Sequence, residues 1–331
     1  MELKKLGEFG LIEKIARGAG AGFPDVIKGI GDDAAVVRSS KTQCQLLTTD
    51  TLIEGIHFER ALTTPYLLGK KCIAVNLSDI AAMGGTPVCF VVSLSIPPKT
   101  PYEFIHKLYQ GMIHRARAFG VSLVGGDTTG SRDHMVITVT VLGTARTDRV
   151  IYRHGARAGD RIYVTGFLGD AALGLLLLQR GKALSRIRLL VAKHLDPMPR
   201  VAEGNTISRM RLASSMIDIS DGLLADLRHI LKESQAGAQI WLNHLPLSPQ
   251  YRQHWQEGAD DRYVPALCGG EDYELLFTVP LDKQKRVAAL EQACGIPVTC
   301  IGEITGKKGA LKVLDEQNRE VTYVKEGFTH F

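Results

Sequence analysis

The sequence predicts an α+β fold with two domains. Helix-like and strand-like segments alternate irregularly along the 331 residues, and some strand-like segments follow one another directly. This order favours α+β over a strict βαβ repeat. At about 100–200 residues per domain, the length indicates about two domains. The polar, glycine-containing segment 152–160 is the best boundary, so we expect one domain over residues 1–150 and another over 151–331.

Apolar spacing and Gly/Pro punctuation predict the elements of the first half. A helix is expected over 3–17, where leucines and isoleucines share one side. Helices over 65–85 and 101–120 are each expected to begin at a proline and end at a glycine. Runs rich in apolar and β-branched residues predict strands at 45–49, 87–97, 121–127 and 135–145.

The second half continues with shorter elements. Strands are expected over 161–166 and, behind two glycines, over 269–280. The segment 214–234 begins as a strand and turns into a helix at Ser220-Asp221. Further helices are expected over 169–181, 197–210 and 281–295. Short strands and a Gly/Pro-bounded tail close the chain.

Composition excludes several classes of protein. Hydrophobic residues make up 45% and charged residues 23%, as in ordinary globular proteins. The 40 Lys and Arg against 35 Asp and Glu form no long basic run, so we expect no nucleic-acid partner. No signal-like or membrane-length apolar stretch is present, which predicts a cytoplasmic protein without a membrane partner. The six cysteines form no C-x-x-C pair, so neither a zinc site nor a disulfide framework is expected.

Aspartates recur at the ends of apolar or glycine-rich segments, beside Gly, Ser, Thr or Asn. They are Asp32, Asp33, Asp50, Asp79, Asp127, Asp218 and Asp221. Any one of them is also explained as a turn or cap residue, and Asp221 in particular is a credible N-cap. Together, carboxylates gathered on one side of a fold would repel one another and need raised pKa values or bound cations. Oxygen ligands without His or Cys clusters suit Mg²⁺, which bridges to substrate phosphates. The set therefore indicates a magnesium-dependent phosphate enzyme.

The usual nucleotide motifs are absent. There is no G-x-x-x-x-G-K-[ST] loop and no protein-kinase H-R-D or D-F-G motif. The glycines of "VGGDTTG" could let backbone N–H groups approach a phosphate, although that signal alone is weak.

Several motifs in this order resemble the thiamine-monophosphate kinase family. They are "GEFGLI", "GIGDDAAV", "TTDTLIEGIHF", "AVNLSDIAAMGG", "VGGDTTG", "DISDGLLADL", "GGEDYELLFT" and the tail "GFTHF". The resemblance covers essentially the whole chain and extends to the superfamily of aminoimidazole ribonucleotide synthetase and selenophosphate synthetase. It implies an N-terminal α/β domain that forms a β-barrel with its copy in a homodimer, and a C-terminal α+β domain. It also implies transfer of a phosphate from ATP to thiamine monophosphate.

The resemblance further implies a role for individual residues. The magnesium ligands would be Asp33, Thr48, Thr49, Asp50, Asp79, Asp127, Asp218 and Asp221. The ATP contacts would be Gly126, Asp127, Arg153 and Ser220. His57, Glu271 and Phe328 would face the thiamin phosphate. Several Mg²⁺ ions per site are implied, and a K⁺ requirement stays open. The pattern departs from the family at His154, which follows Arg153.

The implied chemistry needs no acid or base. A phosphate monoester is already largely anionic at pH 7, because its second pKa is about 6. Asp50, Asp127 and Asp221 would act electrostatically through the metal, in a direct in-line transfer. Glu271 and Asp272 are also a candidate acid–base pair, but a carboxylate and the aromatic face of Phe328 suit the cationic thiamin head. Alternatively, His57 is a surface turn residue and Phe328 a core plug.

Two other functions stay open. Another enzyme of the superfamily would share the fold, but selenophosphate synthetase is expected to carry a reactive cysteine in an N-terminal glycine-rich loop, and "GAGAGF" has none. A non-enzymatic metal- or nucleotide-binding regulator would tolerate the loss of some aspartates, and here all are present.

Overall fold

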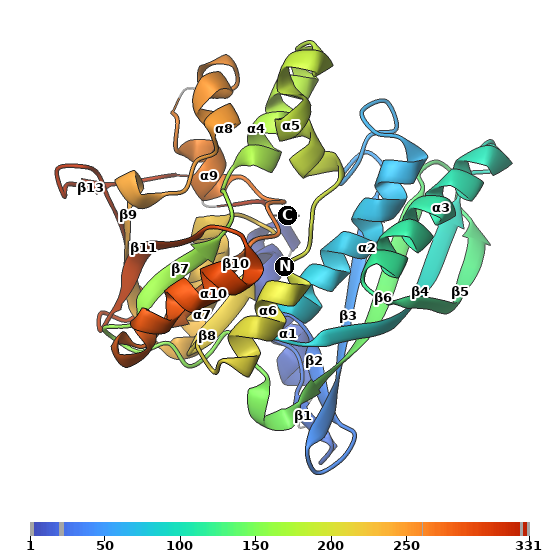
Figure 1. Cartoon of the computed structure of the whole chain (residues 1–331). Coiled ribbons are helices and arrows are strands. Elements are labelled where there is room, and N and C mark those ends of the chain that lie inside the picture. Colours follow the sequence, from blue (N-terminus) through green and yellow to red (C-terminus); the bar gives the residue numbers. More distant parts are fainter. Residues whose placement is uncertain (1–2, 20–22, 260, 325–326, 330–331) are drawn as a thin grey trace.

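Two β-sheets, one from each half of the chain, form the framework of the protein (Figure 1). The structure is a computed structural model, and it describes residues 3–19, 23–259, 261–324 and 327–329. No helix among these residues has the length and apolar content needed to cross a membrane. The end of the "GFTHF" tail, residues 330–331, lies outside the described residues.

The first sheet has six strands in the order β1-β2-β3-β6-β4-β5. The strands are β1 (Val26–Lys28), β2 (Ala35–Arg38), β3 (Gln43–Ile53), β4 (Thr86–Ile96), β5 (Ser122–Gly130) and β6 (Val136–Arg146). Only β4 and β5 pair in parallel. Buried and exposed residues alternate along β3, since one face of the sheet is covered and the other open.

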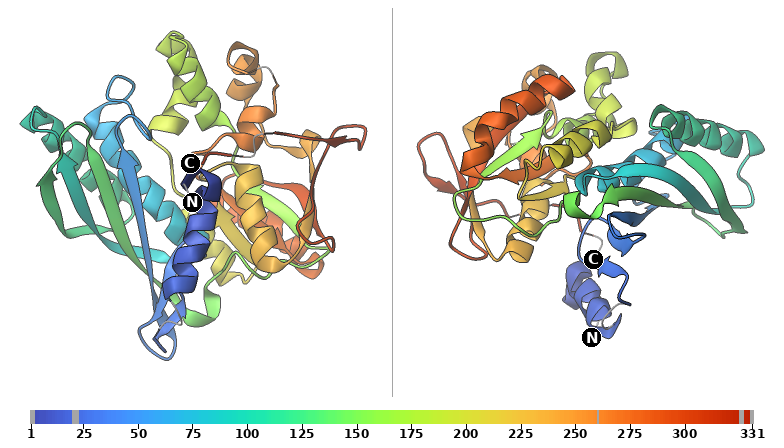
Figure 2. Two further views of the ribbon diagram at one scale, coloured as in Figure 1. Left: turned by 180° about the vertical axis from the view of Figure 1, so that it is seen from behind. Right: turned by 60° about the horizontal axis from the view of Figure 1, so that its bottom comes forward.

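Two helices cover one face of this sheet, α2 (Pro65–Ala82) and α3 (Tyr102–Ala118) (Figure 2). The Thr64 hydroxyl caps α2 by accepting the Leu67 N–H at 3.2 Å, Pro65 occupies its first turn, and Gly84 follows its end with φ 68°. The predicted proline start and glycine stop are confirmed. A Cβ on Gly111 would lie 1.9 Å from the Tyr66 carbonyl oxygen, so glycine is required for α2 and α3 to pack this closely.

The second sheet has seven strands in the order β13-β12-β9-β11-β7-β10-β8. The strands are β7 (Arg161–Thr165), β8 (Ser215–Asp218), β9 (Gly237–Trp241), β10 (Leu275–Val279), β11 (Val298–Thr305), β12 (Leu311–Leu314) and β13 (Glu320–Val321). Only β9 and β12 pair in parallel. The mixed, largely antiparallel sheets agree with the predicted α+β class, but the described residues contain no closed barrel.

The remaining helices lie mainly around the second sheet. They are α1 (Leu3–Ala19), α4 (Asp170–Gln179), α5 (Leu184–Leu195), α6 (Val201–Arg209), α7 (Leu223–Ser234), α8 (Pro249–His254), α9 (Val264–Cys268) and α10 (Val287–Cys294). Single 3₁₀ turns occur at Thr147–Arg149, Leu242–His244, Trp255–Glu257 and Leu281–Arg286. The helices α4 and α5 form a hairpin that rises beside α2 (Figure 1).

Two expected elements differ from the structure, and one observed helix was not expected. The helix expected from residue 197 begins only at Val201, because prolines occupy positions 197 and 199. The strand expected from 269 begins at Leu275. Before it the chain forms a loop in which Glu271 and Tyr273 have positive φ. The helix α5 was not expected, because no proline or glycine marks its ends as clearly as those of α2.

Candidate active site

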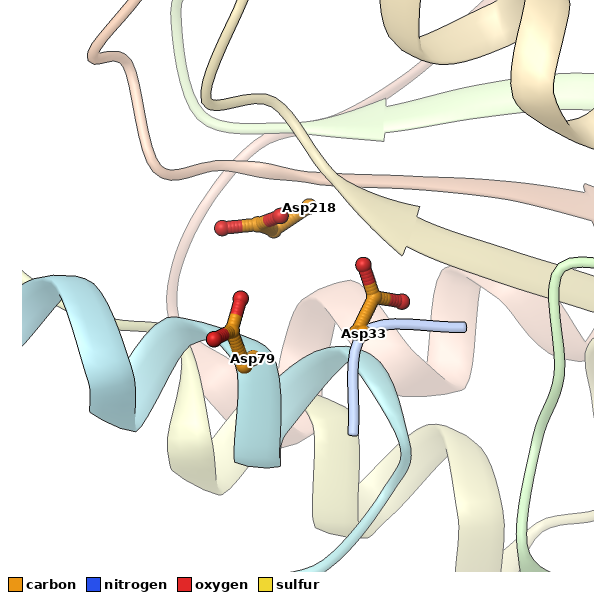
Figure 3. A group of neighbouring side chains, drawn as sticks. All are labelled: Asp33, Asp79 and Asp218. Carbon is orange, nitrogen blue, oxygen red and sulfur yellow. The ribbon is translucent and has the colours of Figure 1, made fainter. Parts of the chain in front are cut away.

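Three of the predicted aspartates converge where the two halves of the chain meet (Figure 3). Asp33 precedes β2, Asp79 lies in the last turn of α2, and Asp218 ends β8. One carboxylate oxygen of each lies within 4.8 Å of the others. The residues are 46 and 139 positions apart in the chain, so tertiary structure alone brings them together.

Thr48 and Asp50 of β3 extend this cluster. Their side chains lie on the same face of the strand, because alternate residues of a strand point the same way. The Thr48 hydroxyl donates a hydrogen bond to Asp79. Asp50 is close enough for its charge to raise the pKa of Asp79, and Asp221 and Asp33 in turn raise the pKa of Asp50.

Burial and mutual repulsion make the ionised cluster unfavourable without a cation. Burial, followed by the charge of Asp33, raises the pKa of Asp218 to about 8. Burial raises the pKa of Asp50 to about 6, and that of Asp79 well above its usual value. The C-terminal position of Asp79 in α2 adds to this, because the helix dipole disfavours an anion there. One oxygen of Asp33, Oδ2, is buried without a hydrogen-bond partner in the described part of the chain.

The cluster fits a hard divalent cation. It offers several carboxylate oxygens and a hydroxyl, and neither histidine nor cysteine is part of it. Such a donor set suits Mg²⁺. A cation would also provide a partner for the unpaired Asp33 oxygen and relieve the repulsion that raises these pKa values.

Arg153 supplies the cluster's own positive charge. Its Nη2 donates to Asp33 Oδ1 at 2.6 Å, and its backbone N–H donates to Asp32. Burial, opposed in part by Arg153, raises the pKa of Asp32 to about 7. His154 turns away from this contact and stacks on Tyr152 with ring centroids 4.9 Å apart.

The loop between β8 and α7 carries Ser220 and Asp221. Asp226 Oδ2 accepts the backbone N–H groups of Ser220, Asp221 and Gly222 at 3.0–3.1 Å. The N-cap residue of α7 is Gly222, which has no side chain to cap the helix. The alternative that Asp221 caps α7 is therefore wrong, since the buried Asp226 satisfies these N–H groups instead.

A cleft of about 1050 Å³ begins at this cluster and extends between α2 and the α4–α5 hairpin. Asp50, Asp79, Asp218 and Asp221 line one part of it. The apolar side chains of Leu175, Leu176 and Val264 line another part. Carboxylates that hold a cation in one part, with apolar walls in another, suit a ligand with a phosphate and a ring system.

The three residues predicted on the substrate side all line this cleft: His57, Glu271 and Phe328. The rings of His57 and Phe328 lie 6.3 Å apart. His57 Nδ1 accepts the Ile53 N–H at 3.0 Å, so the neutral ring carries its proton on Nε2. Phe328 is 40% exposed, so it is not a core plug. The backbone N–H groups of Glu271 and Phe328 donate to the carbonyls of Ser220 and Asp221, which joins both sides of the cleft at one loop.

Glu271 lies between a lysine and a histidine. Lys71 Nζ lies 2.6 Å from Oε1, and His194 Nδ1 lies 2.6 Å from Oε2. Asp272 lies apart from this pair and accepts the Gly169 N–H at 2.7 Å. The alternative of Glu271 and Asp272 as an acid–base pair has no support in this geometry, because their carboxylates serve different partners.

Three predicted residues lie away from the cluster within one chain. The Thr49 hydroxyl is on the open face of the first sheet, 2.9 Å from the Thr140 hydroxyl. Gly126 and Asp127 lie on the edge strand β5, which three strand spacings separate from Asp50 on β3. At about 4.8 Å per spacing this is roughly 14 Å. A Cβ on Gly126 would lie 2.1 Å from the Val92 carbonyl oxygen, so strand packing alone requires this glycine.

Sequence reasoning missed Lys71, His194 and Asp226. Lys71 and His194 lie inside helices with no motif of their own, and no local pattern predicts that both reach Glu271. Asp226 had a local signal, an acidic residue in the first helical turn after Ser220-Asp221-Gly222, where exposed N–H groups need acceptors.

Comparison with known proteins places the whole chain in one family. Residues 31–145 match the AIR synthase related protein N-terminal domain, and residues 157–313 match the corresponding C-terminal domain. Thiamine-monophosphate kinase of Buchnera aphidicola subsp. Schizaphis graminum is 37% identical, and the match covers 98% of both chains. The same enzyme of Escherichia coli K12 is 37% identical over 98% of both chains.

Solved structures agree. AaThiL complexed with AMPPCP and TMP has a TM-score of 0.87 and 34% identity, and the match covers 100% of this chain and 99% of that one. Thiamine-monophosphate kinase from Stenotrophomonas maltophilia K279a has a TM-score of 0.76 at 37% identity, over 92% of this chain and 96% of that one. Escherichia coli HypE, a hydrogenase maturation protein, shares the fold with a TM-score of 0.70 but only 18% identity.

Proposed function

The chain belongs to the thiamine-monophosphate kinase family, and we propose that it transfers the γ-phosphoryl group of ATP to thiamine monophosphate, giving ADP and thiamine diphosphate. The observation that carries the proposal is the cleft itself. Four of the aspartates that the family pattern marks for metal, Asp50, Asp79, Asp218 and Asp221, line one cavity with the three residues it marks for substrate. The related AaThiL was solved with AMPPCP and TMP together, which supports the same pair of substrates here.

We assign metal binding to Asp33, Thr48, Asp50, Asp79, Asp218 and Asp221, whereas the Thr49 hydroxyl and Asp127 do not reach this cluster within their own chain. Bound Mg²⁺, several ions per site, would neutralise the phosphates of ATP and of the acceptor. Arg153 and Ser220 contact ATP from beside this cluster. While no cation is bound, Arg153 balances part of the negative charge of the cluster through its ion pair with Asp33. A K⁺ requirement stays open.

The acceptor needs no general base. Its phosphate oxygen is already largely ionised at pH 7. The protein's task is to hold two anionic groups in line and exclude water, and transfer is direct, without a phosphoenzyme. His57 donates to the acceptor phosphate from Nε2, Glu271 receives the cationic part of the substrate, and the exposed face of Phe328 packs against its rings.

The functional unit is a homodimer whose first sheets close a barrel. Two features of the described chain support this. The open face of the first sheet exposes apolar side chains, with Leu47 45% and Val91 37% exposed. All nine residues of the edge strand β5 are exposed, including Val124 at 63%. In such a dimer Gly126 and Asp127 of the partner subunit lie across the interface, which would bring them to a cluster they do not reach within their own chain.

The protein works in the cytoplasm. Its two domains divide near residue 150. The segment at 150–160 supports the division, since it links the last strand of the first sheet to the first strand of the second.

The test is a product assay. Purified protein is incubated with MgATP and thiamine monophosphate, and the thiamin species are separated by chromatography. We expect thiamine diphosphate with the native chain and at least a 100-fold lower rate with Asp50→Ala, because loss of one charge-stabilising group costs about 10²–10³ in rate. Consumption of ATP with another acceptor, but not with thiamine monophosphate, would refute the substrate assignment. Radiolabel from γ-labelled ATP retained on denatured protein would refute direct transfer.

A further inference from the structure

Two neighbouring lysines of α2 make separate ion pairs with the second half of the chain. Lys70 pairs with Asp196, which also pairs with Arg115 of α3. Lys71 pairs with Glu271, which also pairs with His194 at the end of α5. The segment 194–196 is therefore connected to the first half in two ways. Asp196 contacts Lys70 and Arg115 directly, and His194 is linked to Lys71 through Glu271. Of the three first-half residues, Lys71 lines the cleft.

Glu271 occupies a demanding position. Its backbone has φ 69°, a conformation that non-glycine residues seldom adopt, and its N–H donates to the Ser220 carbonyl at 2.8 Å. Each carboxylate oxygen has a side-chain nitrogen at 2.6 Å, yet the side chain stays 25% exposed toward the cleft. The carboxylate thus has a fixed direction and an accessible edge.

Without Lys71 and His194, burial would favour the protonated, neutral form of the Glu271 carboxylate. Burial raises the pKa of Glu271, but the charges of Lys71 and His194 outweigh it and lower the pKa to about 2. The cleft wall is otherwise acidic. Its carboxylates are Glu8, Asp50, Glu59, Asp79, Asp218, Asp221, Asp261 and Glu271. Among the described residues that line the cleft, Lys71 is the one lysine or arginine. Its side chain is only 4% exposed, so solvent screens it little.

We propose that Lys71 and His194 are positioning residues that hold the Glu271 carboxylate oriented toward the cationic part of the substrate. The two come from different halves of the chain, Lys71 from α2 and His194 from α5. The substrate-binding carboxylate is therefore assembled only when the α4–α5 hairpin is docked on α2. This inference rests on the proposed function, and it adds the residues that set affinity for thiamine monophosphate.

The test compares Lys71→Met with Lys70→Met. Methionine keeps much of the lysine volume and removes the charge. Lys70→Met also removes an ion pair between α2 and the second half, but it leaves Glu271 untouched, so it controls for lost docking. The measurements are the Kd of thiamine monophosphate by calorimetry in Mg²⁺ without ATP, and the KM for each substrate. His194→Gln is the second variant.

We expect Lys71→Met to raise the Kd and KM for thiamine monophosphate about tenfold or more, because the Glu271 carboxylate loses the charged partner that orients it. The KM for ATP should change by less than about twofold, and Lys70→Met should leave both within about twofold. In a Glu271→Gln background, Lys71→Met should add less than about twofold, since residues that act through each other are non-additive.

Three results would overturn the inference while the native chain still makes thiamine diphosphate. They are an unchanged Kd in a folded Lys71→Met protein, an equal effect of Lys70→Met, or full additivity with Glu271→Gln. A melting curve establishes that each variant is folded. If the native chain makes no thiamine diphosphate, the proposed function fails instead.

Discussion

Asp218→Asn should stabilise the metal-free protein at neutral and alkaline pH. Asp218 is 1% exposed, and its Oδ2 accepts the Ser78 hydroxyl at 2.6 Å. Asparagine keeps an oxygen for this bond and offers an N–H₂ group to the neighbouring carboxylates of Asp33 and Asp79. The variant therefore imitates the protonated aspartate, which is the favoured form while no cation is bound.

The magnitude follows from the pKa of Asp218, which is about 8 in the folded protein against an ordinary value of 3.8. The folded chain keeps a proton that the unfolded chain releases, so the free energy of unfolding falls as pH rises from about 4 to about 8. At about 1.4 kcal/mol per pH unit, the loss by pH 7 is on the order of 4 kcal/mol. If all 331 residues unfold as one unit, this corresponds to a Tm difference of about 6 °C.

The assay is thermal unfolding in EDTA between pH 5 and 9, repeated in Mg²⁺. The native protein should lose stability as pH rises in EDTA and regain it in Mg²⁺, whereas Asp218→Asn should lose less in EDTA and gain less from Mg²⁺. Asp170→Asn is the control, because Asp170 is also buried but bonds Ser248 outside the cluster. It should keep the full gain from Mg²⁺. An Asp218→Asn protein as pH-sensitive in EDTA as the native one, or equally stabilised by Mg²⁺, would refute the reasoning.

Three further predictions concern other parts of the site. Asp226→Ala removes the acceptor of three backbone N–H groups, so it should lower the free energy of unfolding by about 2–3 kcal/mol and raise the KM for ATP. Asp226→Asn, which keeps one oxygen, should do less, and equal effects would contradict this account. Arg153→Met should lower the Tm in EDTA more than in Mg²⁺, because the cation replaces the lost charge beside Asp33; melting curves in both buffers test this. Val124→Lys on β5 should convert the proposed dimer into monomers in sedimentation and lower kcat at least about tenfold, whereas a monomeric native protein would refute the interface.

Much of the fold could be predicted because its signals are local. The α2 helix illustrates this, since Thr64 and Pro65 at its start and Gly84 after its end each act within one turn. The sequence predicts too early a start for the helix that begins at Val201, because a proline at a segment start is itself a helix signal. The sequence predicts a strand over the loop at 269–274, since no sequence pattern reveals that Glu271 and Tyr273 adopt positive φ.

The site was predicted as a list of residues without their arrangement. The family pattern and the aspartates at segment ends named Asp33, Asp79 and Asp218 together, and the structure shows these three in contact range. The structure also distinguishes the roles of two neighbouring threonines. The Thr48 side chain faces Asp79, whereas the Thr49 side chain faces the open side of the sheet. The placement of Gly126 and Asp127 on a distant edge strand was equally invisible from the sequence.

By itself, the sequence determined the family, the kinds of ligand atom available and the segments that carry them, because these depend on residue identity and short-range order. Only the tertiary structure decided which charges share one cavity. Lys71 and His194 are 123 residues apart and meet at Glu271 because α2 and α5 pack across the cleft. Ion pairs and pKa shifts depend on distance and burial in three dimensions, and neither quantity is encoded in the spacing of residues along a chain.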